Sequence, residues 1–165
     1  DAHLDTWDTY FGAPYTHGTP FRRAREENLF LDDASMHVGI SGPLYSRDDI
    51  INHESFGFPI MLCDEFQTEG TDKIAERIKK RVGDNPLYLS IDIDVLDPAF
   101  APGTGTPEIA GMTTREMVNV LRGLSGLNLI SADVVEVSPA YDHAEVTALA
   151  AATIVYELTN LFAKK

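Results

Sequence analysis

Five side chains with the chemistry of metal ligands stand in two short alternating motifs. Asp1, His3 and Asp5 form the pattern D-x-H-x-D, and Asp92 and Asp94 form the pattern D-x-D. In an extended segment, alternate side chains lie on the same face. Four carboxylates and an imidazole that converge there would repel one another, and divalent cations would relieve the repulsion. Such hard donors favour manganese or magnesium, although either motif alone is also compatible with a turn or a helix cap.

The elements that must position these motifs alternate between β-like and helical patterns. Strands are expected at Ser35–Ile40, Phe58–Cys63, Pro86–Asp94 and Leu127–Val137, and helices at Ile74–Val82, Thr113–Leu124 and Ala144–Phe162. The alternation predicts a mostly parallel sheet covered by helices on both faces, which is a three-layer α/β/α fold. Ligand sites in such folds lie beyond the carboxyl ends of the strands, where we expect the acidic motifs to be.

Two details of the pattern extend this prediction. Thr113 followed by Glu116 is a capping box, which marks a helix start. If the strand at Pro86–Asp94 continues to its end, Ile91 and Ile93 point away from Asp92 and Asp94.

The chain opens at D-A-H-L-D, where a strand should be ending. We therefore expect residues 1–165 to be one domain that lacks its N-terminal strands. The length of 165 residues suits a single compact domain.

The net charge and the cysteine content limit the partners and the cellular compartment that we expect for this protein. The chain has 26 acidic and 13 basic residues, a formal charge of −13, so we expect neither nucleic acid nor an anionic membrane as a partner. No apolar run approaches the roughly 20 residues that span a bilayer. The single Cys63 rules out an internal disulfide and fits a cytoplasmic protein. It stands in an apolar run, far from the acidic motifs, so it is interpreted as a buried small hydrophobe, and structural zinc is not expected.

The order of the motifs resembles that of the ureohydrolase family, which includes arginase and agmatinase. Besides D-A-H-L-D and S-I-D-I-D-V-L-D-P, the chain has H-G-T-P at 17–20, D-P-A-F-A-P-G-T-G-T-P at 97–107, D-V-V-E-V at 133–137 and P-A-Y-D at 139–142. The resemblance covers essentially the whole chain. A-P-G-T-G-T-P and P-A-Y-D resemble agmatinase, guanidinobutyrase and proclavaminate amidinohydrolase more closely than arginase. The glycine-rich stretch lacks a nucleotide-binding pattern and is interpreted as a tight loop beside the site.

The resemblance implies an arginase-like fold and hydrolysis of a guanidino compound to urea and an amine, with two manganese ions. It implies that Asp1 and Asp92 bridge the two ions, that Asp5 completes one shell, and that His3 and Asp94 complete the other. The ions would hold a bridging water and lower its pKa, so that hydroxide attacks the guanidinium carbon. Asp5 would also accept a hydrogen bond from that hydroxide. Trimers or hexamers of a homo-oligomer are expected on the same basis.

Substrate roles follow from the same resemblance. Glu136 matches the carboxylate that holds the guanidinium, and His17 matches a proton carrier for the leaving amine. By their position, Asp8 could face a distal ammonium and Trp7 could pack on a methylene chain, although Trp7 is equally compatible with a core or interface aromatic. Agmatine, which would yield putrescine and urea, is favoured because no Arg or Lys lies within residues 1–19. Guanidinobutyrate and proclavaminate are the alternatives. Arg22 and Arg23 are expected to face solvent or to pair with nearby acids, namely Glu26 and Glu27.

One expected ligand is missing. The family supplies a second histidine from a Gly-Gly-Asp-His motif upstream of the first acidic motif. His37, His53 and His143 do not stand in such a motif; they are expected in the core, in a solvated loop and at a helix start, respectively. We therefore favour a C-terminal part of an active enzyme, because its retained motifs are intact. The alternative, from another class, is a non-catalytic metal-binding module that serves as an oligomer partner.

Overall fold

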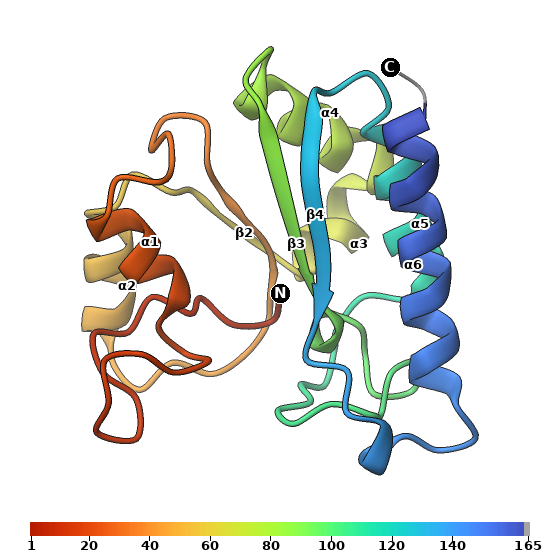
Figure 1. The fold of residues 1–165 in the computed structure, drawn as a ribbon, viewed down its shortest axis with the longest axis horizontal. Helices are drawn as coiled ribbons and strands as arrows, with labels where there is room; N and C mark the ends of the chain where they lie inside the picture. The colour runs from red at the N-terminus through yellow and green to blue at the C-terminus, as the bar shows by residue number, and fades with distance from the viewer. Residues whose placement is uncertain (164–165) are drawn as a thin grey trace.

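The structure is a computed structural model that describes residues 1–163, apart from the side chains of residues 52 and 54. Helices and strands alternate along the chain (Figure 1). Their order is α1 (Pro20–Glu26), β1 (His37–Ile40), α2 (Arg47–Glu54), β2 (Ile60–Leu62), α3 (Asp64–Glu69), α4 (Thr71–Val82), β3 (Leu87–Asp92), the 3-10 helix η1 (Ile93–Val95), α5 (Thr114–Gly123), β4 (Leu129–Val135), the 3-10 helix η2 (Pro139–Tyr141) and α6 (Val146–Ala163). All four expected strands and all three expected helices are present.

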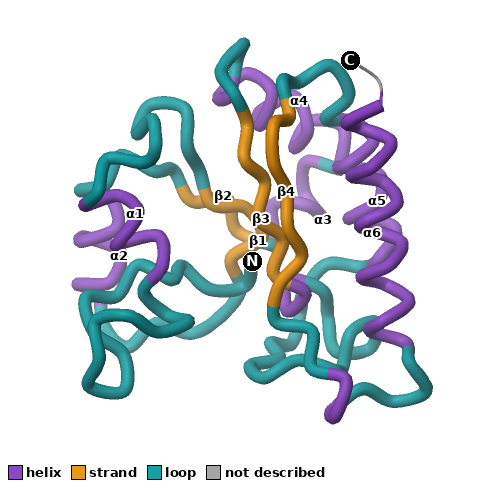
Figure 2. The backbone as a smooth tube through the Cα atoms, viewed as in Figure 1, coloured by secondary structure: helices purple, strands orange, loops and turns teal. Residues whose placement is uncertain are grey.

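The described strands form two parallel pairs. β1 pairs with β2, and β3 pairs with β4. Figure 2 shows the strands in the middle of the molecule, with α1 and α2 on one side and α5 and α6 on the other. In the β3–β4 register Asp92 lies opposite Val135. The two strands therefore end level with each other, and Glu136 leaves β4 beside the end of β3.

The first two residues link the two strand pairs. The Asp1 nitrogen donates to the Val38 carbonyl (3.2 Å), and Ser41 N donates to the Ala2 carbonyl (3.1 Å). On the other side, Ala2 N donates to Asp94 Oδ1 (3.2 Å). Asp1 and Ala2 thus lie between the end of β1 and the end of β3, so the first acidic motif enters the molecule where parallel strands end.

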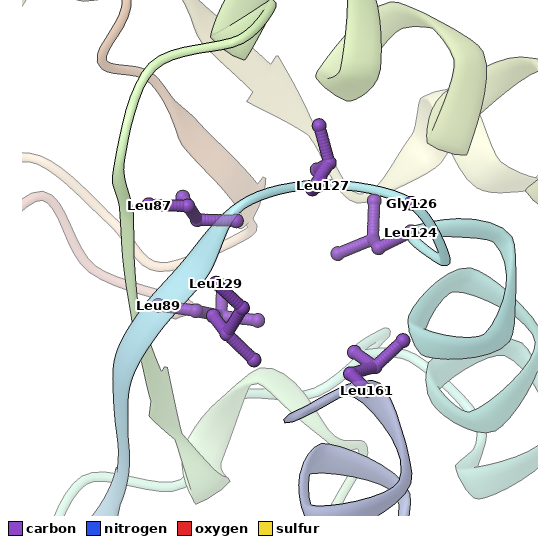
Figure 3. Close-up of a pocket in the computed structure, with 7 residues that line it drawn as sticks. All are labelled: Leu87, Leu89, Leu124, Gly126, Leu127, Leu129 and Leu161. Atoms are coloured by element: carbon purple, nitrogen blue, oxygen red, sulfur yellow. The ribbon is translucent and has the colours of Figure 1, made fainter. Parts of the chain in front are cut away.

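The core lies between the strands and the helices that cover them. α4 buries Ile74, Ile78 and Val82, and α5 buries Met117 and Leu121. Both helices therefore present an apolar stripe to the core, as their spacing predicts. Leucines of β3 and β4 face leucines at the ends of α5 and α6 around a small pocket (Figure 3). This pocket is lined by apolar side chains, which identifies it as part of the packing.

Two local predictions are confirmed. The capping box begins α5, since Thr113 Oγ1 accepts from Glu116 N (3.1 Å) and Thr113 N donates to Glu116 Oε2 (2.8 Å). Cys63 is buried, and burial raises the pKa of its thiol to about 11. The thiol is therefore held in its unreactive, protonated form at neutral pH.

No apolar segment long enough to span a bilayer was expected from the sequence, and helix α6 corrects this expectation. Among the described residues it is long and apolar enough, by length and composition alone, to cross a membrane. It packs against β4 and α5, and its buried Glu157 accepts two hydrogen bonds from Arg122 at the surface of α5 (3.1 and 2.6 Å). A single helix of this length and composition is weak evidence for a membrane span.

The prediction for His53 was wrong. It lies in α2 and is fully buried, with its ring 4.7 Å from the ring of His37. Phe58 and Phe56 also contact it. His37 is buried as expected, and burial followed by the neighbouring His53 lowers its pKa to about 3. Local sequence could not reveal this packing, because the aromatic residues that enclose both imidazoles come from several separate segments.

Candidate metal centre

The second acidic motif departs from the expected alternation. β3 ends at Asp92, and Asp94 lies in η1. The Asp92 carboxylate accepts a hydrogen bond from Asp94 N (3.0 Å), which turns the chain out of the strand. Ile91 and Ile93 are as buried as the two acids. Ile91 and Ile93 were expected to point away from Asp92 and Asp94 if the strand continued to Asp94. The strand ends at Asp92, so this alternation does not extend to Asp94.

The first acidic motif is also bent. His3 N donates to Asp1 Oδ1 (2.6 Å), and Asp5 has a positive φ of 53°. Glu136 also has a positive φ, of 63°. Residues other than glycine seldom adopt this left-handed conformation, and they do so where the surroundings impose it, often at functional sites.

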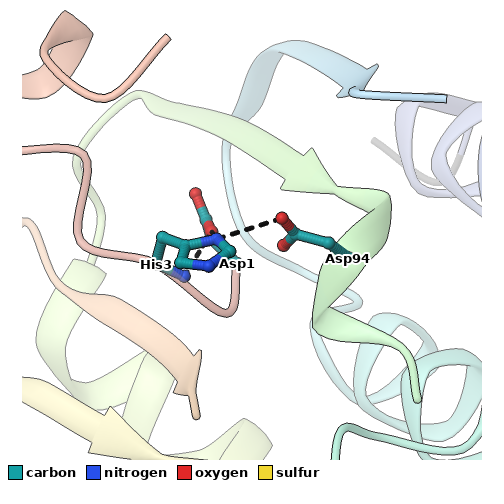
Figure 4. A group of neighbouring side chains, drawn as sticks. All are labelled: Asp1, His3 and Asp94. Atoms are coloured by element: carbon teal, nitrogen blue, oxygen red, sulfur yellow. Dashed lines mark hydrogen bonds and ion pairs between the residues drawn. The ribbon is translucent and has the colours of Figure 1, made fainter. Parts of the chain in front are cut away.

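The structure brings the five predicted ligands into two overlapping groups. Ligand atoms of Asp1, His3 and Asp94 lie within 4.8 Å of one another, and so do those of Asp1, Asp5 and Asp92. Asp1 belongs to both groups. Figure 4 shows the three side chains of one group, with His3 and Asp1 overlapping in this view and a dashed line that runs to the Asp94 carboxylate. His3 Nδ1 lies 3.0 Å from Asp94 Oδ2 and 3.8 Å from Asp1 Oδ1.

Burial and the charges of neighbouring groups shift the pKa values of the candidate ligands. Burial, and then the neighbouring Asp94 charge, raise the pKa of Asp92 to about 8. Burial also raises the pKa of Asp5 to about 7. Burial acts in the same direction on Asp94, but the hydrogen bond and charge of His3 outweigh it and hold the pKa of Asp94 below its usual value. The hydrogen bond to Asp94 raises the pKa of His3 to about 9. A divalent cation would relieve this repulsion, so the donor set fits hard ions such as manganese.

Two loops complete the wall of the site. Thr106 Oγ1 donates to Asp94 Oδ2 (3.1 Å), and Glu108 Oε1 lies 3.1 Å from His3 Nε2. Glu136 is exposed, and its Oε2 would lie 4.0 Å from a Cβ built on Gly105. Its charge also raises the pKa of Asp5. The predicted guanidinium-binding carboxylate thus lies beside the loop at 104–107, near one of the two ligand groups.

Trp7 is held in an aromatic cluster rather than facing solvent freely. Its ring stacks on Tyr10 (4.8 Å between centroids) and lies 5.0 Å from Tyr45. Its indole nitrogen donates to Asp49 Oδ1 (3.1 Å). His17 is exposed, and its ring lies 5.1 Å from that of Tyr10. Trp7 and His17 therefore both contact Tyr10, and neither belongs to the two ligand groups.

Asp8, which was expected to face a distal ammonium, pairs with two arginines in the structure. Its Oδ1 accepts from Arg23 (2.9 Å) and lies 3.5 Å from Arg22 Nε. Both arginines also pair with Glu26 at 3.1 Å, as expected. The sequence pattern could show pairing within α1, but not that α1 lies against the loop that carries Asp8.

Comparison with known proteins decides the family. A model of the arginase family matches residues 1–160. The chain belongs to the arginase family. The guanidinopropionase of Pseudomonas aeruginosa is 50% identical over 99% of this chain and 52% of that protein. The agmatinase of Photorhabdus laumondii is 46% identical over 100% of this chain and 50% of that protein. This arginase-family chain therefore spans about half the length of the curated relatives it matches.

Solved structures confirm the fold. The proclavaminate amidino hydrolase of Streptomyces clavuligerus superposes with a TM-score of 0.94 at 41% identity, over 99% of this chain and 55% of that one. The arginase of Bacillus caldovelox superposes with a TM-score of 0.85 at 26% identity, over 100% of this chain and 59% of that one. The predicted arginase-like α/β fold is confirmed, and the chain covers 55% and 59% of the length of these two chains.

Two residues of this arginase-family site were missed from the sequence. Thr106 and Glu108 contact members of the ligand groups, yet 12 residues separate Thr106 from Asp94 and 105 separate Glu108 from His3. The glycine-rich loop was expected to lie beside the site. An acid and a hydroxyl in that loop were the available signal, but which ligands they meet depends on the path of the loop.

Proposed function

We propose that the protein containing this chain hydrolyses a guanidino compound to urea and an amine, with two manganese ions. The observation that carries the proposal is the pair of ligand groups that share Asp1. In each group three donor atoms lie within 4.8 Å of one another, a spacing that suits one hard divalent ion. Two ions in such a cluster supply a nucleophile near neutral pH by lowering the pKa of a bound water.

The remaining residues bind and orient the substrate. Glu136 lies near Asp5 and beside the loop at 104–107, where a carboxylate can pair with a planar guanidinium. Asp5, a member of one ligand group, would also accept a hydrogen bond from the attacking group. His17 is exposed in the aromatic cluster, and we assign it the transfer of a proton to the leaving amine.

Agmatine is the first candidate substrate. The chain carries a formal charge of −13, and a net negative field attracts a ligand that is cationic at both ends. A guanidino acid such as 4-guanidinobutyrate is the second candidate, because Arg23 lies beside Asp8 near Tyr15 and can meet a carboxylate. The relatives include proteins named agmatinase, guanidinopropionase and guanidinobutyrase, which span both kinds of substrate.

The activity is tested by urea release from the full-length protein with manganese. We expect release from agmatine, and loss of both urea release and manganese binding in Asp94→Ala. Asp84→Ala, an exposed acid outside both ligand groups, is the matched control and should keep wild-type activity. Full urea release by Asp94→Ala would contradict the assignment. Manganese binding without urea release by the wild-type protein would support a non-catalytic module instead.

The substrate is tested by kcat/KM for agmatine and for 4-guanidinobutyrate. If agmatine is the substrate, Arg23→Ala removes the shorter of the two ion pairs of Asp8, leaves that with Arg22, and raises kcat/KM for agmatine by about two- to fivefold, the range of an exposed ion pair. If a guanidino acid is the substrate, the same change lowers kcat/KM for 4-guanidinobutyrate. A wild-type preference for 4-guanidinobutyrate would overturn the choice of agmatine and keep the reaction class.

A further inference from the structure

The His3 ring has a carboxylate at each of its two nitrogens. Nδ1 faces the ligand group, 3.0 Å from Asp94 and 3.8 Å from Asp1. Nε2 faces the other way and lies 3.1 Å from Glu108 Oε1. The His3 and Glu108 side chains are 17% and 25% exposed, so this contact is largely shielded from solvent.

The two ring nitrogens have different surroundings, and this decides what each can do. A histidine that binds a metal is neutral and carries its one N–H on the nitrogen that does not bind. Only Nδ1 of His3 lies within the ligand group. Its N–H must then be on Nε2, where it needs an acceptor, and the Glu108 carboxylate is at hydrogen-bonding distance.

We propose that Glu108 is a positioning residue, which accepts the Nε2 hydrogen of His3 and so holds Nδ1 toward the metal. This proposal rests on the proposed metal-dependent function. Glu108 is not itself a member of either ligand group. It acts on the site through the orientation and tautomer of the histidine.

The loop that carries Glu108 is anchored to the element that carries Asp94. Asp97 N donates to the Met112 carbonyl (2.9 Å), and Met112 N donates to the Val95 carbonyl (2.8 Å). Asp97 Oδ2 accepts from Ala110 N (3.0 Å). Glu108 therefore sits on a short loop whose two ends are both fixed to the segment around η1, which is the requirement for a residue that orients another.

The same loop orients the other partner of His3. Thr106 Oγ1 donates to Asp94 Oδ2, the oxygen that also lies 3.0 Å from His3 Nδ1. On its remaining side the His3 ring packs on Gly42, where a Cβ would lie 2.7 Å from Cδ2. Asp94, Glu108 and Gly42 thus all contact the ring, and among the described residues Glu108 is the one that meets its outer nitrogen.

The test is manganese binding by the full-length protein, measured by equilibrium titration with electron paramagnetic resonance detection of free and bound ions. We expect Glu108→Ala to lower the affinity for one of the two manganese ions by about 10- to 100-fold, as loss of a hydrogen-bond partner of a metal ligand does. Glu108→Gln keeps an acceptor oxygen and should fall between wild type and Glu108→Ala. Glu76→Ala, an exposed acid on α4, is the matched control.

The outcomes separate this proposal from the proposed function. A wild-type protein that binds fewer than two manganese ions would overturn the function itself. Two ions in wild type, with unchanged affinities in Glu108→Ala, would overturn the role of Glu108 alone. Equal losses in Glu108→Gln and Glu108→Ala would also overturn it, because glutamine still accepts a hydrogen bond. Glu108→Leu, of similar volume and without an acceptor, replaces alanine if unfolding of the metal-free protein shows that alanine disturbs the fold.

Discussion

Replacing Gly42 with alanine should disable the site without changing any predicted ligand. A Cβ at this position would lie 2.7 Å from Cδ2 of His3, 2.9 Å from its Nε2 and 3.0 Å from the Ala2 carbonyl oxygen. Gly42 is also tied in place, since its nitrogen donates to that carbonyl (2.8 Å). The backbone cannot retreat without breaking this bond, so the imidazole must move.

The size of the effect follows from these distances. Non-bonded carbon atoms pack at about 3.5–4.0 Å, so the ring must shift by roughly 1 Å. A misplacement of about 1 Å that originates outside the reacting groups costs on the order of 100-fold in rate. Overpacking of this kind also costs about 1–3 kcal/mol of folding free energy. We therefore expect kcat to fall about 100-fold while the protein stays folded.

The assay is urea release by Gly42→Ala at saturating manganese, together with manganese affinity and thermal unfolding. Asp84→Ala, an exposed acid outside both ligand groups, is the control. Wild-type kcat and manganese affinity in Gly42→Ala would refute the reasoning that close packing on Gly42 sets the position of His3.

Two further predictions concern the metal-free protein. The pKa of His37 is lowered to about 3, so its neutral form stabilises the fold above the unfolded value near 6.5, and this stabilisation is lost as the pH falls toward 3. Between pH 7 and pH 5, His37 accounts for a loss of about 2 kcal/mol in the free energy of unfolding. Urea denaturation should therefore show a smaller loss over this pH range for His37→Phe than for wild type. If the two proteins lose the same free energy of unfolding, His37 is not the cause. The pKa of Asp92 is raised to about 8, so its contribution to stability is present below about 3.8 and is lost as the pH rises through 8. Asp92→Asn should therefore raise the unfolding temperature at pH 8 by at least about 2–4 °C while abolishing manganese binding, and a lower unfolding temperature than wild type would sink this account.

Local patterns predicted the four strands and three of the six described α-helices, and they singled out the candidate ligands. The capping box of Thr113 and Glu116 satisfies backbone groups within one turn, so adjacent residues determine it. The apolar spacing of α4 and α5 similarly reflects one face of one helix. Asp1, His3, Asp5, Asp92 and Asp94 could be grouped because parallel strands end on the same edge of a sheet.

Errors arose where a side chain's partner comes from another part of the chain. His53 is flanked by polar residues, yet α2 turns it inward against His37 and Phe58. The pairing of Asp8 with Arg23 was not foreseen, because Arg23 lies 15 residues away, across a loop that brings α1 back to it. Burial and pairing are properties of the packed molecule, whereas periodicity reports only which side of its own element a residue occupies.

The sequence by itself determined the types of donor, their order and the family of the chain, because these depend on residue identity and short spacings. Only the tertiary structure decided how the donors are shared between two groups, and which nitrogen of His3 meets Glu108. The physical reason is that Asp1, Asp92 and Glu108 are separated by long stretches of chain. Their geometry depends on the turn after β3 and on the path of the loop that follows it.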